Sequence, residues 1–273
     1  MQDEITIGKH SFLRNGKTYI MGILNVTPDS FSDGGHYTHL EAAMCRVEKM
    51  IKEGASIIDV GGESTRPDYT QISIEEEIRR VVPVIRLIKE KYDIAISVDT
   101  YKSEVAKAAI LAGADLVNDI WGLKYDKKMA GVIQESGASV CLMHNRKNID
   151  YQDFFEDLKS DLWESIQIAR EAGIPENRVM IDPGVGFAKS LKMNLICINR
   201  LEELHSLGFP ILLGTSRKSV IGLTLDLPVT EREEGTLTTT VLAVNKGCQF
   251  VRVHSIEENR RAIVMAEAIL AAK

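Results

Sequence analysis

Eight short apolar segments of this sequence each lead into polar side chains that could bind a ligand. The first segment, 19–24, shows no polar alternation, as expected for a strand that is buried on both faces. The polar residues around the ends of the eight segments are Asn25, Glu63 with Thr65 and Arg66, Asp99, Asn118, His144 after Met143, Asp182, Lys218, and Arg252 with His254. Each alone is equally well explained as a helix cap, a turn former or a surface charge. Eight in equivalent positions indicate one shared site.

These polar residues divide into two chemical groups. Hydrogen-bond acceptors suit the donor-rich edge of a flat heterocycle that carries an amino group, and this group comprises Asp99, Asn118 and Asp182. The second group is mostly cationic and suits a phosphate or a pyrophosphate; it comprises Asn25, Arg66, Arg252 and His254. Lys218 lies between the two groups, where residues 217–222 predict a short extra helix whose amino end can receive an anion.

Strand-like and helix-like segments alternate along the chain, and this alternation must position the polar residues. The predicted strands are 19–24, 57–60, 94–98, 116–117, 139–143, 179–181, 211–213 and 250–251. The predicted helices are 40–52, 73–92, 103–112, 127–135, 151–172, 191–206, 234–246 and 256–271. Eight such units predict an α/β fold, a closed (β/α)8 TIM barrel that forms one domain over residues 1–273, with the carboxyl ends of all strands at one mouth. An open doubly wound sheet is the competing architecture, although it more often has a glycine-rich dinucleotide turn after its first strand.

Residues 4–18 precede the barrel and predict a β-hairpin. Asn15 and Gly16 form a favoured two-residue turn between residues 12–13 and 18–19. We expect this hairpin to close the bottom of the barrel.

Composition limits the class of protein. The chain has 273 residues, 44% hydrophobic and 26% charged, with a formal net charge of -6, which argues against a general nucleic-acid binder. The cysteines are widely spaced at Cys45, Cys141, Cys197 and Cys248, so we expect buried free thiols in a reducing compartment. The sequence shows neither a signal-like amino terminus nor an apolar run that could span a bilayer. A cytoplasmic protein without nucleic-acid or membrane partners is therefore expected.

The motifs around these residues resemble those of the dihydropteroate synthases, a family of folate-pathway enzymes, over essentially the whole chain. They stand at 22–35 (GILNVTPDSFSDGG), 61–67 (GGESTRP), 97–100 (SVDT), 118–120 (NDI), 143–145 (MHN), 182–187 (DPGVGF), 214–219 (GTSRKS) and 252–254 (RVH). Eight motifs in the family's order make the resemblance specific. It implies the condensation of 6-hydroxymethyl-7,8-dihydropterin pyrophosphate with 4-aminobenzoate, Mg²⁺ as cofactor, and a homodimer.

The resemblance also implies a role for each site residue. The pterin would be held by Asp99, Asn118, Asp182 and Lys218, with Met143 and Phe187 against its faces. The magnesium and pyrophosphate would lie at Asn25, with the phosphates also contacted by Thr65, Arg66, Arg252, Val253 and His254. The aminobenzoate would be bordered by Phe31, Pro67 and Ser219. The residues expected to act in catalysis are Asn25, Lys218, Arg252 and His254.

Two residues depart from the family's pattern. Asp68 stands where the loop after the second strand commonly has Gly, and Ser255 stands where Asp often follows the Arg-x-His motif. Asp68 brings a negative charge close to where the aminobenzoate carboxylate is expected. The competing interpretations are a methyltetrahydrofolate-corrinoid methyltransferase, which shares the barrel but would not need the loop at 27–31 or residues 216–218, and a non-catalytic binder of pterin or phosphate.

Overall fold

The centre of the protein is a closed parallel barrel. The computed structural model describes residues 4–14, 16–27, 36–63 and 71–272, and the side chains of all of these except 36–39. The barrel strands are β3 (Tyr19–Asn25), β4 (Ile57–Gly61), β5 (Ala95–Asp99), β6 (Leu116–Asp119), β7 (Ser139–Met143), β8 (Val179–Asp182), β9 (Leu212–Leu213) and β10 (Phe250–Val253). They pair in the order β8-β7-β6-β5-β4-β3-β10-β9, and a parallel bridge between Ile181 and Ile211 joins the two ends of that order. The predicted TIM barrel is confirmed, and the open doubly wound sheet is wrong.

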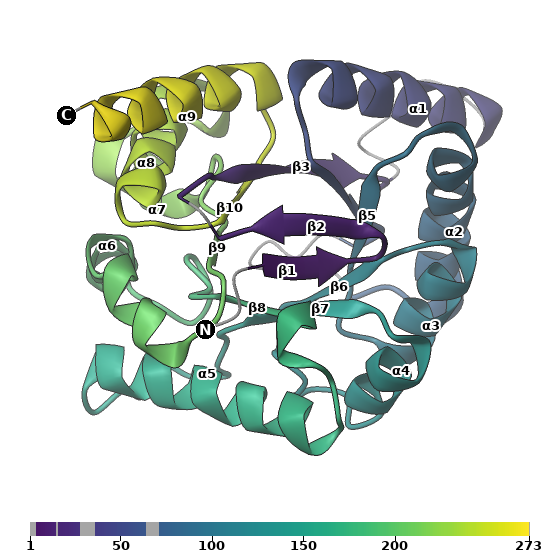
Figure 1. Ribbon diagram of the computed structural model, residues 1–273, viewed down its shortest axis with the longest axis horizontal. Helices are drawn as coiled ribbons and strands as arrows, with labels where there is room; N and C mark the ends of the chain where they lie inside the picture. The colour runs from purple at the N-terminus through teal and green to yellow at the C-terminus, as the bar shows by residue number, and fades with distance from the viewer. Residues whose placement is uncertain (1–3, 15, 28–35, 64–70, 273) are drawn as a thin grey trace.

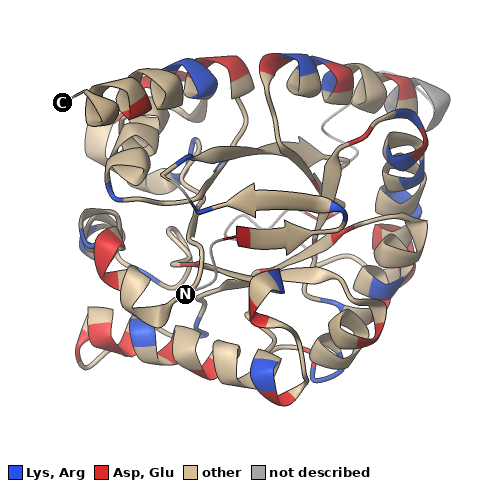
Figure 2. Ribbon diagram, in the orientation of Figure 1, with Lys and Arg blue, Asp and Glu red and all other residues tan. Residues whose placement is uncertain are grey.

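Helices surround the barrel (Figure 1). They are α1 (His36–Glu53), α2 (Ile74–Lys91), α3 (Ser103–Ala112), α4 (Met129–Ser136), α5 (Phe154–Glu171), α6 (Leu191–Asn199), α7 (Ser219–Leu225), α8 (Glu233–Asn245) and α9 (Ile256–Ala271), with the short 3-10 helices η2 (Glu176–Arg178), η3 (Leu201–Leu207) and η4 (Val229–Glu231). The prediction of one helix over 191–206 is wrong, because Arg200 leaves helical geometry and separates α6 from η3. Figure 2 shows that charged residues gather on these outer helices.

The barrel interior has one apolar layer and one layer in which most side chains are polar. The lower layer, here called the floor, consists of Met21, Ile57, Ala95, Leu116, Cys141, Met180, Leu212 and Phe250, all buried. Successive side chains of a strand point to opposite faces, so the next interior residue of each strand lies two positions further on. These residues form the mouth layer, which comprises Ile23, Asp59, Ser97, Asn118, Met143, Asp182, Gly214 and Arg252. The parallel strands therefore place the predicted polar residues at one end of the barrel.

A β-hairpin covers the floor, as predicted. Strands β1 (Glu4–Ile7) and β2 (His10–Leu13) pair antiparallel, and the hairpin lies across the front of the barrel in Figure 1. Its inward residues Ile5, Ile7 and Phe12 pack in the same apolar cluster as the floor. The register pairs Ile7 with His10, so the turn of this hairpin is at residues 8–9 and not at the predicted Asn15–Gly16; Asn15 itself lies outside the described residues. Gly8 supplies the positive φ of 59° that this two-residue turn requires.

The cysteines only partly match the prediction of buried thiols. All four are free; three are buried, whereas Cys45 on α1 is exposed. Burial raises the pKa of Cys197 and of Cys248 to about 12. Among the described residues, no helix is both long enough and apolar enough to cross a membrane.

Candidate active site

The mouth of the barrel is organised around one arginine and two aspartates. Arg252 Nε donates to Asp59 Oδ2 at 2.6 Å, and its Nη2 donates to Asp99 Oδ2 at 2.6 Å. We expected Arg252 at a phosphate and Asp99 at a ring, as members of separate groups. In the structure they are bonded to each other, so the two predicted chemical groups share one cluster.

Asp59 is a site residue that the sequence interpretation missed. It lies within β4, is fully buried, and accepts from Asn118 Nδ2 at 3.3 Å as well as from Arg252. The signal was present in the sequence, because an aspartate inside the apolar run of residues 57–60 has a large desolvation penalty unless it is paired. Its place inside a strand distinguishes Asp59 from the predicted site residues, most of which stand at the ends of strands or after them.

Burial sets the charge state of this cluster. It raises the pKa of Asp99 to about 7; the nearby Asp59 also raises it, while Arg252 opposes the change. Burial disfavours the charged guanidinium of Arg252 too, but Asp59 and Asp99 outweigh this effect and raise its pKa above the ordinary value. One guanidinium is therefore shared between two carboxyl groups and does not pair all four of their oxygen atoms.

Three buried oxygen atoms in this region have no protein partner among the described residues. They are Asp59 Oδ1, Asp99 Oδ1 and Ser97 Oγ. Buried polar atoms are nearly always hydrogen-bonded, so these atoms indicate a place where a ligand can supply donors. Their types match the predicted recognition of an amino-bearing heterocycle.

Asp182 lies on the other side of Arg252 at the same mouth. Its Oδ1 accepts from Gly184 N at 2.7 Å, and burial raises its pKa. A methyl group built on Gly214 would lie 3.6 Å from Asp182 Oδ2 and 3.8 Å from Arg252 Cβ. Asp182 and Arg252 thus flank Gly214 and share one opening, as predicted.

Lys218 and two apolar side chains form a further wall of the mouth. Lys218 Nζ donates to Val185 O at 2.5 Å and lies 4.6 Å from the centre of the Phe187 ring. Burial lowers the pKa of Lys218 to about 8. Phe187 and Met143 belong to one apolar cluster with Tyr101, Ile120 and Trp121. A flat ring could pack on this surface while its edge meets Asp182 or Asn118.

The remaining predicted residues lie around this core or outside the described part of the chain. His254 follows β10, and its Nδ1 lies 2.9 Å from Ser216 Oγ. Asn25 ends β3, and its Oδ1 would lie 3.6 Å from a methyl group on Gly61. Val253 is buried and Ser219, the first residue of α7, is exposed. The residues outside the described ranges are Phe31, Thr65, Arg66, Pro67 and Asp68.

A second buried cluster near the mouth was not predicted. Lys102 Nζ donates to Glu63 Oε2 and to Glu77 Oε2, each at 2.7 Å. Tyr101 OH donates to Glu63 Oε1 at 2.7 Å. Glu63, which we expected among the ligand-binding residues, is thus fully engaged in linking β4 to the loop after β5 and to α2.

Ser255 also has a structural partner. Its hydroxyl donates to Glu233 Oε2 at 2.9 Å and accepts from Arg217 Nη2 at 3.0 Å. The residue joins the loop before α7 to the first turn of α8. An aspartate at this position would face Glu233, so serine suits this chain.

The fold and the mouth together define the class of protein: the chain belongs to the pterin-binding enzyme family, whose sequence pattern matches residues 21–254. Within that family, the similar proteins are dihydropteroate synthases. The one from Clostridium beijerinckii is 55% identical over 265 residues, which cover 97% of this chain and 98% of the relative.

Two solved structures of dihydropteroate synthases are similar in fold and sequence. One from Clostridium difficile, in the presence of pteroic acid, has a TM-score of 0.91 and 49% identity, covering 94% of this chain and 98% of that chain. One from Xanthomonas albilineans with 4-aminobenzoic acid has a TM-score of 0.94 and 37% identity, covering 100% of both. This likeness is far above what a shared barrel alone would require.

Proposed function

We propose that this chain catalyses the dihydropteroate synthase reaction, joining 6-hydroxymethyl-7,8-dihydropterin pyrophosphate to 4-aminobenzoate and releasing pyrophosphate. The observation that carries the proposal is the set of buried acceptor oxygens at the mouth, close to two cationic side chains, Lys218 and Arg252. A substrate with a donor-rich ring and an anionic leaving group needs both features in one opening.

The ring end of the substrate would bind on the side of Asp99, Asn118 and Asp182. The pterin edge carries an amino group and ring N–H donors, which can satisfy Asp59 Oδ1 and Asp99 Oδ1. The apolar cluster that contains Met143 and Phe187 would pack against the ring faces.

The pyrophosphate end would bind toward β3, β4 and β10, which are neighbours in the barrel. The two aspartate bonds use Nε and Nη2 of Arg252, and its Nη1 makes no hydrogen bond to a described residue. His254 and Asn25 stand at the ends of the same strands. Thr65 and Arg66, outside the described ranges, remain predicted phosphate contacts.

Magnesium remains part of the proposal. The described residues include no group of three His, Cys, Asp or Glu side chains that could hold a metal. Mg²⁺ is commonly bound by one or two protein oxygens together with substrate phosphates, so the single amide oxygen of Asn25 fits an ion that is shared with the pyrophosphate. When bound, such an ion would neutralise charge on the leaving group.

In the chemical step, the amine nitrogen of 4-aminobenzoate bonds to the exocyclic methylene carbon of the pterin. The carbon–oxygen bond to pyrophosphate breaks, the leaving group takes the electron pair, and the nitrogen loses a proton. Negative charge grows on the leaving oxygen. Arg252 and His254 would stabilise that charge, the electrostatic form of catalysis.

Replacing Arg252 by alanine tests this assignment. Turnover should fall about 100-fold or more, because the guanidinium stabilises the departing charge. Pterin affinity should fall less, through the loss of the pairs with Asp59 and Asp99. Steady-state kinetics and pterin titration would measure the two quantities, with Arg261→Ala on the exposed side of α9 as the control. Equal losses in turnover and affinity would contradict the assignment.

A direct assay separates the proposed reaction from its competitors. With both substrates and Mg²⁺, the protein should release pyrophosphate and form dihydropteroate. A corrinoid methyltransferase would do neither, and a non-catalytic binder would bind pterin without turnover. The relatives reported above carry the synthase name, so the methyltransferase alternative is not favoured.

We also propose that two copies of the chain associate through the adjoining helices α7, α8 and α9 (Figure 1). These helices expose large apolar side chains, among them Leu223, Val264, Met265, Ile269 and Leu270, each more than half exposed. Exposed apolar side chains gathered on adjoining helices are typical of protein interfaces. Met265→Asp should shift sedimentation toward the monomer, whereas Leu111→Asp on α3, at a residue that is even more exposed (81% against 61%), should not. A monomeric unaltered protein would refute the proposal.

A cytoplasmic location is proposed on the cysteines. Cys141, Cys197 and Cys248 are buried free thiols, a state typical of reducing compartments. Fractionation of cells that produce the protein would test it.

A further inference from the structure

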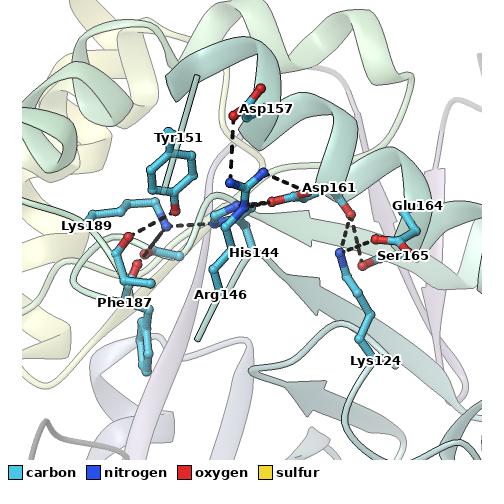
Figure 3. Close-up of polar contacts among 12 residues, drawn as sticks. Lys124, His144, Arg146, Tyr151, Asp157, Asp161, Glu164, Ser165, Phe187 and Lys189 are labelled. Atoms are coloured by element: carbon cyan, nitrogen blue, oxygen red, sulfur yellow. Dashed lines mark hydrogen bonds and ion pairs between the residues drawn. The ribbon is translucent and has the colours of Figure 1, made fainter. Parts of the chain in front are cut away.

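Lys189 is a buried lysine in the loop between β8 and α6, outside the residues assigned to the site. Its Nζ donates to Gly184 O at 2.9 Å, to Phe187 O at 3.0 Å and to His144 Nδ1 at 2.8 Å (Figure 3). A lysine ammonium has three donors and no acceptor. Three neutral acceptors therefore use its full hydrogen-bonding capacity.

The bond from Lys189 fixes the tautomer of His144. Because the ammonium only donates, Nδ1 must accept and the ring proton must lie on Nε2. Nε2 stands 2.9 Å from Asp161 Oδ2, and Arg146 Nε donates to the same oxygen at 2.5 Å. Burial lowers the pKa of His144 to about 4, and the charge of Lys189 acts in the same direction. At neutral pH the neutral ring thus links Asp161 on α5 to Lys189.

The loop that Lys189 holds makes several contacts with the candidate active site. Gly184 N donates to Asp182, Val185 O accepts from Lys218, and the Phe187 ring lies beneath the Lys218 ammonium. Lys189 binds the carbonyl groups of Gly184 and Phe187, the first and last residues of this segment. The ammonium thus braces both ends of the segment, in addition to the turn hydrogen bond that Phe187 N donates to Gly184 O at 3.1 Å.

The backbone of this loop is one that needs external support. Gly184, Gly186 and Ala188 all have positive φ, of 67°, 91° and 44°, and the last is unfavourable for a residue with a Cβ. A methyl group on Gly184 would lie 2.0 Å from His144 O, so the loop packs directly against the end of β7. Side-chain bonds must compensate for this conformation.

We propose that Lys189 is a positioning residue for the pterin side of the site: held by His144, which Asp161 orients, its ammonium fixes residues 184–187 and thereby the Phe187 ring and the Lys218 ammonium. The inference rests on the proposed function for its ligand, because the ring that Phe187 and Lys218 would contact is the pterin. The hydrogen bonds drawn in Figure 3 connect α5, through His144 and Lys189, to the mouth of the barrel.

Matched substitutions can distinguish positioning from simple space filling. Lys189→Met keeps most of the side-chain volume and removes the ammonium. His144→Asn places an amide oxygen where Nδ1 stands and preserves an acceptor for Lys189, whereas His144→Gln reaches the position of Nε2 and does not. Lys192→Met, on the exposed side of α6, is the control for loss of a lysine.

Two measurements on the full-length protein give the readouts. Hydrogen exchange of the amides in residues 184–187, without ligand, should become faster in Lys189→Met and His144→Gln. The Kd for pteroic acid should rise about tenfold or more in the same variants, the size expected when hydrogen bonds to a charged group are lost. His144→Asn should stay close to the unaltered protein in both, and the KM for 4-aminobenzoate should change less than the pterin Kd.

Two results would overturn the inference. Unchanged exchange at 184–187 in Lys189→Met would show that the ammonium does not hold the loop. Equal damage from His144→Asn and His144→Gln would show that packing, and not the acceptor at Nδ1, matters. The exchange measurement needs no ligand, so failure of the unaltered protein to bind pteroic acid would count against the proposed function separately. If Lys189→Met does not fold, the histidine pair still decides the question.

Discussion

The floor and the mouth layer of the barrel are built by the same strands, two residues apart, and they differ more in chemistry than in burial. Phe250 on the floor and Asp59 at the mouth are both 0% exposed. Burial of an aromatic side chain stabilises the fold, whereas burial of a carboxylate carries a desolvation penalty that its ion pair only partly offsets. The floor therefore stabilises the fold. The mouth layer lowers the stability of the fold, and in return its buried acceptor atoms are available to bind a ligand.

The comparison is most directly tested at Phe250. Phe250→Ala should lower the free energy of unfolding by about 3–5 kcal/mol, because the ring packs against Phe12 at 5.5 Å between centroids and would leave a cavity. Urea unfolding would measure the loss. Pterin affinity of the folded fraction should be unchanged, and a variant that kept its stability but lost pterin binding would break the division between floor and mouth.

The cost of burying a carboxyl group at the mouth can be measured at Asp99 from the pH dependence of stability. Its pKa is raised from an ordinary value near 4 to about 7, so the folded protein binds this proton more tightly than the unfolded chain. Between those pH values the contribution of Asp99 to the unfolding free energy should fall as pH rises, by on the order of 1 kcal/mol per pH unit. Asp99→Asn should reduce the slope by that amount in urea unfolding at several pH values, with the contribution of buried Asp119, whose pKa is raised to about 6, left in place. Asp93→Asn at the surface should retain the full slope. Parallel curves for all three proteins would contradict this pKa assignment.

Asp182 offers the smallest of these effects and the clearest separation of binding from stability. Asp182→Asn should weaken pterin binding by about 1.5–3 kcal/mol, the range for a hydrogen bond to a charged group. Its free energy of unfolding should stay equal or rise, because a buried carboxylate is removed. Titration calorimetry with pteroic acid measures the first quantity, with exposed Asp150→Asn as the control. If Asp182→Asn bound pteroic acid as tightly as the unaltered protein, Asp182 would not be a pterin contact.

The barrel was predictable because its signals are local. Apolar strands, amphipathic helices and glycine stops recur along the chain; α3 and α4, for example, end at Gly113 and Gly137 in left-handed geometry. Parallel strands then place Asp182 and Arg252 at one opening without further information. The hairpin turn was misassigned because Asn15–Gly16 is the stronger turn signal, whereas the side chains that pack on the floor require the turn at residues 8–9.

The contacts within the site were not predictable to the same extent. Residue types at strand ends located Arg252 and Asp99, but their ion pair depends on distance across the barrel interior. Lys189 and His144 are separated by 45 positions in the chain, and no sequence period marks them as partners. Interactions of this kind arise from tertiary packing. The location of the site was therefore more predictable from the sequence than the way in which its charged groups pair.

The uneven exposure of the cysteines offers a simple gauge of folding. Cys45 on α1 is accessible, while Cys141, Cys197 and Cys248 are enclosed. A maleimide reagent should therefore modify one thiol on the folded protein and four after denaturation. Mass spectrometry of the labelled chain would then give the fraction of unfolded molecules. The same accessible sulfur is a ready attachment point for a fluorophore on the outer wall, away from the mouth.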